Sequence, residues 1–493
     1  KYESTIYQVV PGQEPTRLTG SNSDSRPEFS PDGKTLAFLS RRSGSSQVWL
    51  LPLDGGEARQ LTSIKGGVSQ FKWFPDSQML ALLANITPTG IEPEEQKDDD
   101  SDPYIKYNRD VKVIDELFYK LDGVGYFSER RPQLCVMEVG EGSKPQQLTQ
   151  HPYRAGSIAD ISPDGQEILF TSLRGENYDR EAWQQHLWAI PVCGGEPEQL
   201  VGGEYGVQAA AYSPDGRQVA FVASFTKQMG YDNGRLYLQA RAGGKEREVA
   251  PNYDRPFSSL SLTDLGAAGR LPLTWANDGQ SIFAPASVDG AVHLVNVNIT
   301  TGAVEQLTAG EQIIISYSFY KTQSKAVLTV GNFLNPSDIY MFDLATRSQQ
   351  RLTEVNRELL AELELSEPVH YTFRAEGGPE VDGWVMQPIG FDPAKRYPAV
   401  LEVHGGPMMM YAYSFFFEFQ LMTAQGYAVI FTNPRGSQGY GEAFCKAIQY
   451  EWGNLDYVDV MAGLESALAA NPWIDPKRVA VAGGSYGGYM SAW

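Results

Sequence analysis

Residues 483–487 read Gly-Gly-Ser-Tyr-Gly and match the pattern G-x-S-x-G, directly after the apolar run RVAVAG. Where this pattern joins a buried strand to a helix, the turn strains the serine backbone and holds its hydroxyl at the C-terminal edge of the sheet. Only small neighbours fit such a turn, and Gly483 and Gly487 provide them. We therefore predict that Ser485 is a nucleophile. The alternative interpretation is a glycine-rich turn with an idle serine.

A serine hydroxyl attacks a carbonyl carbon only with a base to take its proton and donors to stabilise the oxyanion. The N–H of Tyr486 follows the nucleophile, and the stretch HGGP, residues 404–407, ends an earlier apolar run. Because Gly406 has no side chain to block the approach, its N–H is the second predicted donor. His404 precedes Ser485, whereas this arrangement orders its triad as Ser, Asp and His, so we interpret His404 as fixing the loop. A plain loop turn is the alternative for HGGP.

The sequence stops at Trp493, eight residues after Ser485, so no Asp or His follows the nucleophile in it. Without a base, Ser485 would keep only the residual effect of the oxyanion donors and of substrate binding. We expect that the intact protein continues past Trp493 and supplies both groups there. A nicked or truncated product is the alternative.

The elements that must position Ser485 lie in residues 369–493. The runs VHYTFRA and VDGWVMQP predict a hairpin, and YPAVLEV and YAVIFT are near-continuous apolar strands that end in glycine-rich turns. Between them and RVAVAG, the segment NLDYVDVMAGLESALAAN has helical spacing and places four apolar residues on one face, namely Val458, Met461, Leu464 and Leu468. Strands that alternate with helices predict a doubly wound α/β domain. We expect the aromatic stretch Tyr411–Phe419 to pack mainly in its core.

The first two-thirds of the chain repeat one phrase. The copy FSPDGKTLAFLSRRSGSSQVWLLPLDGGEARQLT recurs in degraded form, with an Asp-Gly turn between alternating strands and a closing QLT. The closing residues are Leu18, Leu61, Leu148, Leu200, Val249, Leu307 and Leu352. Their spacing of mostly about 50 residues is typical of four-stranded propeller blades. We predict a seven-bladed β-propeller over 1–353 with a partial first blade, an acidic insertion around 91–131 and a linker over 354–368.

Composition excludes several functions. Lys plus Arg number 40 against 60 Asp plus Glu, and the net charge of −20 disfavours binding to nucleic acid or to an anionic membrane. Five His and three Cys are too few and too scattered for a metal cage, so we predict no metal and no cofactor. An odd number of distant cysteines suits the reducing cytoplasm. No apolar run reaches the roughly 18 residues needed to cross a bilayer.

The segments HGGP, FEFQLMTAQGYAVIFTNPRGSQGYGEAF, WGNLDYVDV and RVAVAGGSYGGYM together resemble the prolyl oligopeptidase family of serine peptidases, and most closely its acylaminoacyl-peptidase branch. The resemblance implies a seven-bladed propeller that caps an α/β-hydrolase domain, incomplete here, and admits only short peptides. It makes Ser485 the nucleophile and Gly406 and Tyr486 main-chain oxyanion donors. Where related branches use a tyrosine hydroxyl for the oxyanion, this chain has His404.

The resemblance implies a serine oligopeptidase or exopeptidase that forms an acyl-enzyme on Ser485, in the cytoplasm, and it is compatible with a homo-oligomer. A carboxylesterase using the same site is one alternative. A non-catalytic propeller binding protein is another, if Asp and His are truly absent. The dipeptidyl-peptidase branch grips the substrate amine with paired glutamates on a helix. The one Glu-Glu pair here, Glu94-Glu95, falls in the acidic insertion and counts against that activity.

Overall fold

The structure, a computed structural model, describes residues 3–92, 103, 107, 111–122, 124–176, 178–180, 184–266 and 271–493. The chain forms two compact units, one of Lys1–Phe221 with Gln239–Lys245 and one of Val222–Leu238 with Glu246–Trp493. Most of the predicted acidic insertion, including the pair Glu94-Glu95, lies outside the described residues. The predicted domain boundary at residue 353 stays a prediction.

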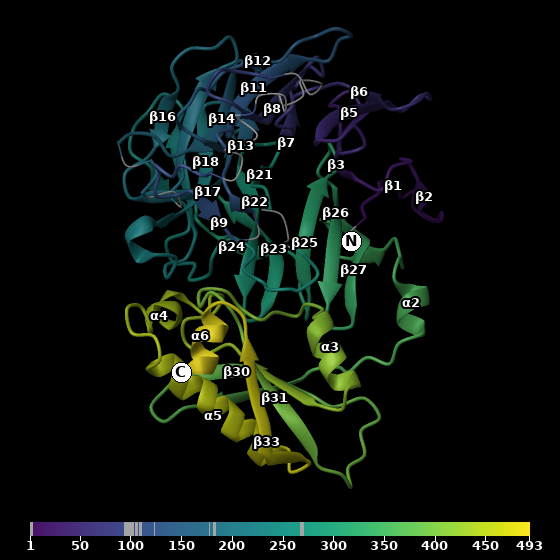
Figure 1. The fold of residues 1–493 in the computed structure, drawn as a ribbon, viewed down its shortest axis with the longest axis vertical. Helices are drawn as coiled ribbons and strands as arrows, with labels where there is room; N and C mark the ends of the chain where they lie inside the picture. Colours follow the sequence, from purple (N-terminus) through teal and green to yellow (C-terminus); the bar gives the residue numbers. More distant parts are fainter. Residues whose placement is uncertain are drawn as a thin grey trace. The chain divides into compact units, whose positions relative to one another are not determined.

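The first unit is built of antiparallel sheets (Figure 1). Its first four-stranded sheet is β3 (Asp24–Phe29), β4 (Thr35–Ser40), β5 (Gln47–Pro52) and β6 (Arg59–Gln60). The second is β7 (Val68–Trp73), β8 (Met79–Ile86), β11 (Arg131–Glu138) and β12 (Gln146–Gln147). The third is β13 (Ala155–Ile161), β14 (Glu167–Ser172), β15 (His186–Pro191) and β16 (Glu198–Val201). Two strand pairs complete the unit, β1 (Tyr7–Gln8) with β2 (Thr16–Arg17) and β9 (Lys120–Leu121) with β10 (Gly125–Tyr126).

A further sheet of β17 (Tyr205–Tyr212), β18 (Gln218–Phe225), β19 (Arg235–Ala240) and β20 (Arg247–Glu248) contains the residues at which the units divide. The second unit continues with an eight-stranded sheet that joins two such meanders. These are β21 (Thr274–Trp275), β22 (Ser281–Val288), β23 (Ala291–Asn298) and β24 (Val304–Gln306), then β25 (Ile313–Phe319), β26 (Lys325–Asn332), β27 (Asn335–Asp343) and β28 (Gln349–Arg351). The meanders follow the predicted repeat. No sheet of the described residues closes on itself, so the seven-blade count stays a prediction.

The Ser-Pro-Asp-Gly phrase has a local reason. The Ser30 hydroxyl donates to Asp32 Oδ1 at 2.6 Å, and the N–H of Lys34 donates to the same oxygen at 3.1 Å. Gly33 completes the turn at φ +72°, a conformation that side chains disfavour. The same pair of bonds recurs at Asp164 and Asp215. Each turn therefore supplies its own hydrogen bonds between the first two strands of a repeat.

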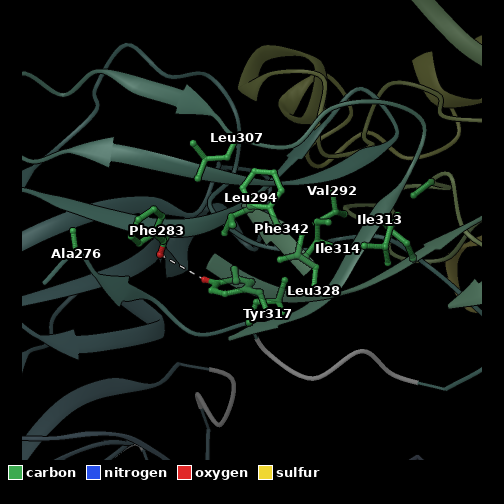
Figure 2. Packing of buried hydrophobic residues seen from close by; sticks show 14 of the residues in the cluster. Ala276, Phe283, Val292, Leu294, Leu307, Ile313, Ile314, Tyr317, Leu328 and Phe342 are labelled. Atoms are coloured by element: carbon green, nitrogen blue, oxygen red, sulfur yellow. Dashed lines mark hydrogen bonds between the residues drawn. The ribbon is translucent and has the colours of Figure 1, made fainter. Parts of the chain in front are cut away.

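Apolar side chains from β22 to β27 form one of the cores of the second unit (Figure 2). Phe342, Val292 and Leu294 are fully buried in it. β22 and β23 are buried along most of their length, as strands packed on both faces are, whereas β26 alternates between buried and less buried positions. The core explains why consecutive meanders remain attached although β23 and β25 share only one parallel pair.

The α/β part of the second unit is a five-stranded sheet. Its order is β29 (Val369–Arg374), β30 (Glu380–Met386), β32 (Ala428–Thr432), β31 (Tyr397–Val403) and β33 (Ile474–Gly483). The predicted hairpin is β29 with β30, and β31 pairs in parallel with both β32 and β33. Short helix α2 (Arg357–Ala361) lies in the predicted linker.

Helices cover both faces of this sheet (Figure 1). Helices α5 (Leu455–Ala470) and α6 (Tyr486–Ala492) pack on one face, through Val460 and Met490 among others. Helix α3 (Phe417–Ala424) packs on the other face with Tyr411 and Phe419, which are both buried there. Helix α4 (Glu442–Lys446) follows β32.

The predicted apolar face of α5 coincides only in part with the buried face: Leu464 and Leu468 pack, partly buried, against the core, but Val458 does not. The helix buries Asp456, Asp459, Val460, Gly463 and Ala467, whereas Val458 is 41% exposed. Apolar periodicity assigns charged residues to the solvent side, but both aspartates here have buried hydrogen-bond partners. The buried face therefore combines apolar contact, for example by Val460, with satisfied polar burial of the two aspartates.

The turn between β33 and α6 passes very close to the end of β31. A Cβ added to Gly483 would lie 2.5 Å from the Val403 carbonyl oxygen, and one added to Gly487 would lie 1.9 Å from the same oxygen. Because that oxygen belongs to a strand backbone, neither clash could be relieved by a side-chain rotation. The predicted need for small residues at both positions is confirmed.

Glu402 lies near the end of β31 and is only 4% exposed. Its neighbours Leu401 and Val403 pack against the α5 and α6 face, so its carboxyl faces the α3 side. Oε1 has no hydrogen-bond partner within the described residues. Burial raises the pKa of this carboxyl to about 7, and the negative charge of Glu418 adds to the rise.

Gly487→Ala should destabilise the protein strongly, by about 3 kcal/mol or more, because the new methyl group would overlap the Val403 backbone. Gly484→Ala is the matched control: a Cβ there meets nothing within 4 Å, so its cost should stay below about 1 kcal/mol. Thermal unfolding of both purified variants measures the difference. Equal stability of the two variants would contradict the close approach.

Glu402→Gln should change the pH dependence of stability. Below the ordinary pKa of 4.5 the carboxyl is protonated in both the folded and the unfolded states. As pH rises from there to about 7, the unfolded chain releases this proton while the folded protein keeps it, so stability falls and then levels off. The variant lacks this loss, which is on the order of 3 kcal/mol.

Thermal unfolding of wild type and Glu402→Gln at pH 5 and pH 8 tests this. The gain in stability of the variant over wild type should be clearly larger at pH 8. A gain of the same size at both values would show that Glu402 does not titrate in this range.

Candidate active site

Ser485 occupies the turn after β33 in the strained conformation that its motif predicts. Its backbone has φ +57° and ψ −119°, a conformation that residues other than glycine rarely adopt. The residue is exposed, and its hydroxyl has no hydrogen-bond partner within the described residues. It lies at the carboxyl end of β33, beside the carboxyl end of the parallel strand β31. The side chain is thus held out at the sheet edge rather than used in packing.

The stretch HGGP, which we call the oxyanion loop (residues 404–407), lies against this turn. A Cβ added to Gly405 would lie 3.5 Å from Ser485 Cβ and 3.3 Å from the Gly484 carbonyl oxygen. Gly406 is exposed and has φ +125°, and a side chain there would meet the N atom of Met408 at 2.6 Å. A side chain at Gly405 would be tight against the Gly484 carbonyl, whereas one at Gly406 would clash with the backbone of its own loop.

The two predicted oxyanion donors are the main-chain N–H groups of Tyr486 and Gly406. Tyr486 is the first residue of α6, so its N–H has no partner inside the helix. Neither the Tyr486 N–H nor the Gly406 N–H donates to an acceptor within the described residues. Free donors beside a nucleophile are what a developing oxyanion requires.

His404 is buried, and both of its ring nitrogens are engaged away from Ser485. The carbonyl of Gly405 accepts a hydrogen bond from Nδ1 at 2.8 Å, and Nε2 lies 2.9 Å from the Ser437 hydroxyl. Because a carbonyl can only accept, Nδ1 carries the proton, and the Nε2 lone pair faces Ser437. Burial lowers the pKa of His404 to about 4, so the ring is neutral at pH 7. The ring ties the oxyanion loop to the loop that follows β32.

The loop after β32 is held by buried polar contacts. The side chain of Asn433 accepts from the Tyr411 N–H and donates to the Tyr411 carbonyl, both at 2.8 Å. The Arg435 guanidinium binds both carboxylate oxygens of Asp459 on α5, at 2.7 and 2.6 Å. Such a two-pronged pair fixes orientation as well as distance. The loop that contains Ser437 is thus anchored to the segment before α3 and to helix α5.

The side chain of Tyr486 points into the protein rather than toward solvent. Its hydroxyl donates to Asp456 Oδ2, and its ring makes an edge contact with Trp452 at 5.0 Å between centroids. Burial raises the pKa of Tyr486, and the bond to Asp456 raises it further. Helix α6, which begins directly after Ser485, is therefore attached to α5 through its first residue, Tyr486.

Sequence reasoning brought together Ser485, Gly406 and Tyr486; the structure places Ser485 and Tyr486 in one turn with Gly405, the neighbour of Gly406, against it, and the roles of the three stay a prediction. Sequence reasoning missed Asp456, Asp459 and Ser437, whose roles depend on partners distant in the chain. The one available signal was the row of small residues on α5, where Gly463 approaches the sheet so closely that a Cβ would lie 2.7 Å from Thr432. Because α5 lies this close to the sheet at Gly463, Asp456 and Asp459 on the same side of the helix are buried as well.

The described residues contain no group of three or more His, Cys, Asp or Glu side chains placed to hold a metal ion. None of the helices in the described ranges is both long and apolar enough to span a membrane. Within the same ranges, none of the histidines bonds to the Ser485 hydroxyl.

Comparison with known proteins connects this geometry to a family. Residues 413–493 match the model of the prolyl oligopeptidase family. The chain is 31% identical over 495 residues to an uncharacterized peptidase, YuxL, of Bacillus subtilis, covering 99% of this chain and 73% of the relative. It is 25% identical over 487 residues to dipeptidyl-peptidase 5 of Porphyromonas gingivalis, covering 95% of this chain and 67% of that protein.

Among solved structures, the acylaminoacyl peptidase of Pyrococcus horikoshii superposes with a TM-score of 0.76 at 22% identity, over all of this chain and 70% of its own. This likeness shows a shared fold, a propeller followed by a hydrolase domain. Together with the strained serine and the peptidase relatives, these findings place the chain in the prolyl oligopeptidase family, whose members are serine peptidases.

Proposed function

We propose that the protein hydrolyses short peptides as a serine exopeptidase of the acylaminoacyl-peptidase type, through an acyl-enzyme on Ser485. The observation that carries the proposal is the exposed Ser485, strained at φ +57° with the Gly405–Gly406 backbone against it. Peptidase relatives support the class of reaction. The net charge of −20 supports small peptide substrates over nucleic acid.

In the proposed reaction, Ser485 Oγ attacks the carbonyl carbon of the scissile bond and passes its proton to a general base. The carbonyl oxygen becomes an oxyanion, which accepts hydrogen bonds from the N–H groups of Gly406 and Tyr486. Collapse of this intermediate expels the amine, which leaves with a proton, and the acyl group stays on Ser485. Water then attacks the ester and releases the acid.

His404 serves this chemistry indirectly. A neutral ring bound to Ser437 keeps a positive charge from competing for the oxyanion and holds the oxyanion loop in place. The base that accepts the Ser485 proton is a separate group, because the one unprotonated ring nitrogen of His404, Nε2, already contacts the Ser437 hydroxyl.

A dipeptidyl-peptidase activity is the second candidate, since the similarity to dipeptidyl-peptidase 5 extends over nearly the whole chain. The two activities differ in the group before the scissile bond, a blocked amine in one and a free amine in the other. An esterase acting through the same serine is also retained, because esters are cleaved more easily than amides.

Ser485→Ala should lower peptidase turnover by at least about 10⁴-fold and abolish labelling by a fluorophosphonate probe. Ser491→Ala is the matched control, since this serine lies in α6, which directly follows Ser485, and its hydroxyl donates to the Gly487 carbonyl. It should label like wild type. Mass spectrometry of the full-length labelled protein locates the adduct, and a probe found on any other residue would refute the proposed nucleophile.

Turnover of three substrates should separate the candidate activities. Of the two p-nitroanilides, we expect the N-acetyl-amino-acid substrate to have a higher kcat/KM than a dipeptidyl substrate with a free amine. A p-nitrophenyl ester should be cleaved in addition to these amides. A higher value for the free-amine substrate would reassign the protein as a dipeptidyl-peptidase. Activity on the ester alone would leave an esterase.

A further inference from the structure

Helix α3 begins without a cap of its own. Phe416 at its N-terminus makes no side-chain capping bond. The first two N–H groups of the helix, on Phe417 and Glu418, donate instead to Asp264 Oδ1 at 2.9 Å and Oδ2 at 2.7 Å. Asp264 lies 153 residues before Phe417, in the connection between β20 and β21. A carboxylate at this position satisfies two orphan donors and complements the positive end of the helix.

The same connection also holds the chain between the oxyanion loop and α3. The N–H of Leu262 donates to the Met410 carbonyl at 3.0 Å, and the N–H of Met410 donates to the Leu260 carbonyl at 3.1 Å. Residues 260–262 therefore pair with Met410 as a short parallel bridge. The Ser414 hydroxyl donates to the Leu262 carbonyl at 2.7 Å. These five hydrogen bonds join the two segments, counting the two that cap α3 through Asp264.

Apolar packing strengthens the attachment. Met410 and Ala412 are 0% and 1% exposed and belong to the core that β22 to β27 form, with Leu294 and Phe342 (Figure 2). Part of the chain after the oxyanion loop is therefore buried among the meander strands. Moving that segment would expose apolar surface as well as break hydrogen bonds.

Residues 407–416 need this support because they form no helix and no strand of their own apart from the bridge at Met410. One end of the segment continues from β31, and the other end enters α3. Gly406 lies at its start, so the placement of the Gly406 N–H depends on how the segment is held.

We propose that residues 260–264 are a positioning element of the oxyanion loop. Asp264 acts through α3, where it anchors the far end of residues 407–416, the segment that follows this loop. A connection between two meander strands then sets the geometry of an oxyanion donor. This inference rests on the proposed function, because it assigns the Gly406 N–H to the oxyanion.

Asp264→Ala removes both capping acceptors from an exposed position, so folding should be retained. Because the oxyanion forms only in the transition state, we expect kcat to fall roughly tenfold with KM changed less than about twofold. Asp264→Asn keeps one acceptor oxygen and should recover most of kcat. Hydrogen exchange followed by mass spectrometry should rise in residues 404–418 of the alanine variant.

Asp343→Ala is the matched control. Its Oδ1 also accepts two backbone bonds, from the N–H groups of Ala345 and Thr346 at 3.0 Å, but in the turn between β27 and β28. This variant should raise exchange only in that turn and keep wild-type kcat. Equal loss of kcat in both variants, or unchanged exchange at 404–418 in Asp264→Ala, would overturn the positioning role.

The exchange measurement also separates this inference from the proposed function. If Ser485→Ala kept its activity, the proposed function would fail, and exchange at 404–418 would still decide whether Asp264 holds the segment. If Ser485 labels normally and Asp264→Ala turns over like wild type, the positioning role alone is refuted.

Discussion

The carbonyl oxygen of Val403 leaves no room for a side chain on either of the two glycines that flank the nucleophile. This close approach of the turn to the end of β31 fixes where Ser485 lies relative to the oxyanion loop, which starts at the very next residue, His404. A turn that passed even one methyl group farther out would separate the serine from Gly405. The position of Ser485 relative to residues 404 and 405 is therefore set by backbone contact, which side-chain motion cannot loosen.

Around this contact, the irregular segments are held by buried polar groups from distant parts of the chain. Arg435 with Asp459 and Asn433 with Tyr411 are examples in which almost every donor and acceptor is satisfied. Loss of one partner from a buried ion pair costs about 3–5 kcal/mol, because the other charge stays buried without compensation. Loops with such anchors have one arrangement, which suits groups that must act without reorganising.

The features of this arrangement that are unfavourable for the free energy of folding lie at the same sheet edge. Ser485 has an unfavourable backbone conformation, worth roughly 1–3 kcal/mol. Two residues before the oxyanion loop, Glu402 carries a carboxyl with an unpartnered oxygen in a buried position. Strain and unsatisfied burial persist only where the surrounding packing over-determines the structure. The cores on both faces of the sheet provide that packing, with Val403 and Tyr486 on one face and Trp384 and Phe431 on the other.

The sequence by itself determined the local features of the protein. The Ser-Pro-Asp-Gly turns, the apolar strands and the strained serine between glycines are each encoded within a few neighbouring residues, because turn geometry and side-chain alternation are local properties. The hairpin of β29 with β30 and the parallel direction of β31, β32 and β33 followed from those patterns, whereas the order of these strands in the sheet did not. Ser485, Gly406 and Tyr486 could be named for the same reason.

Only the tertiary structure decided which distant groups meet. Asp459 and Asp456 are buried although the helical pattern of α5 favours Val458 and Met461 for that face, because Arg435 and the Tyr486 hydroxyl reach them. Asp264 caps a helix 153 residues away, and the His404 ring finds Ser437 rather than Ser485. A local sequence pattern indicates that a residue can form a hydrogen bond. Which partner that residue finds depends on how the sheet and its connections bring separate segments together.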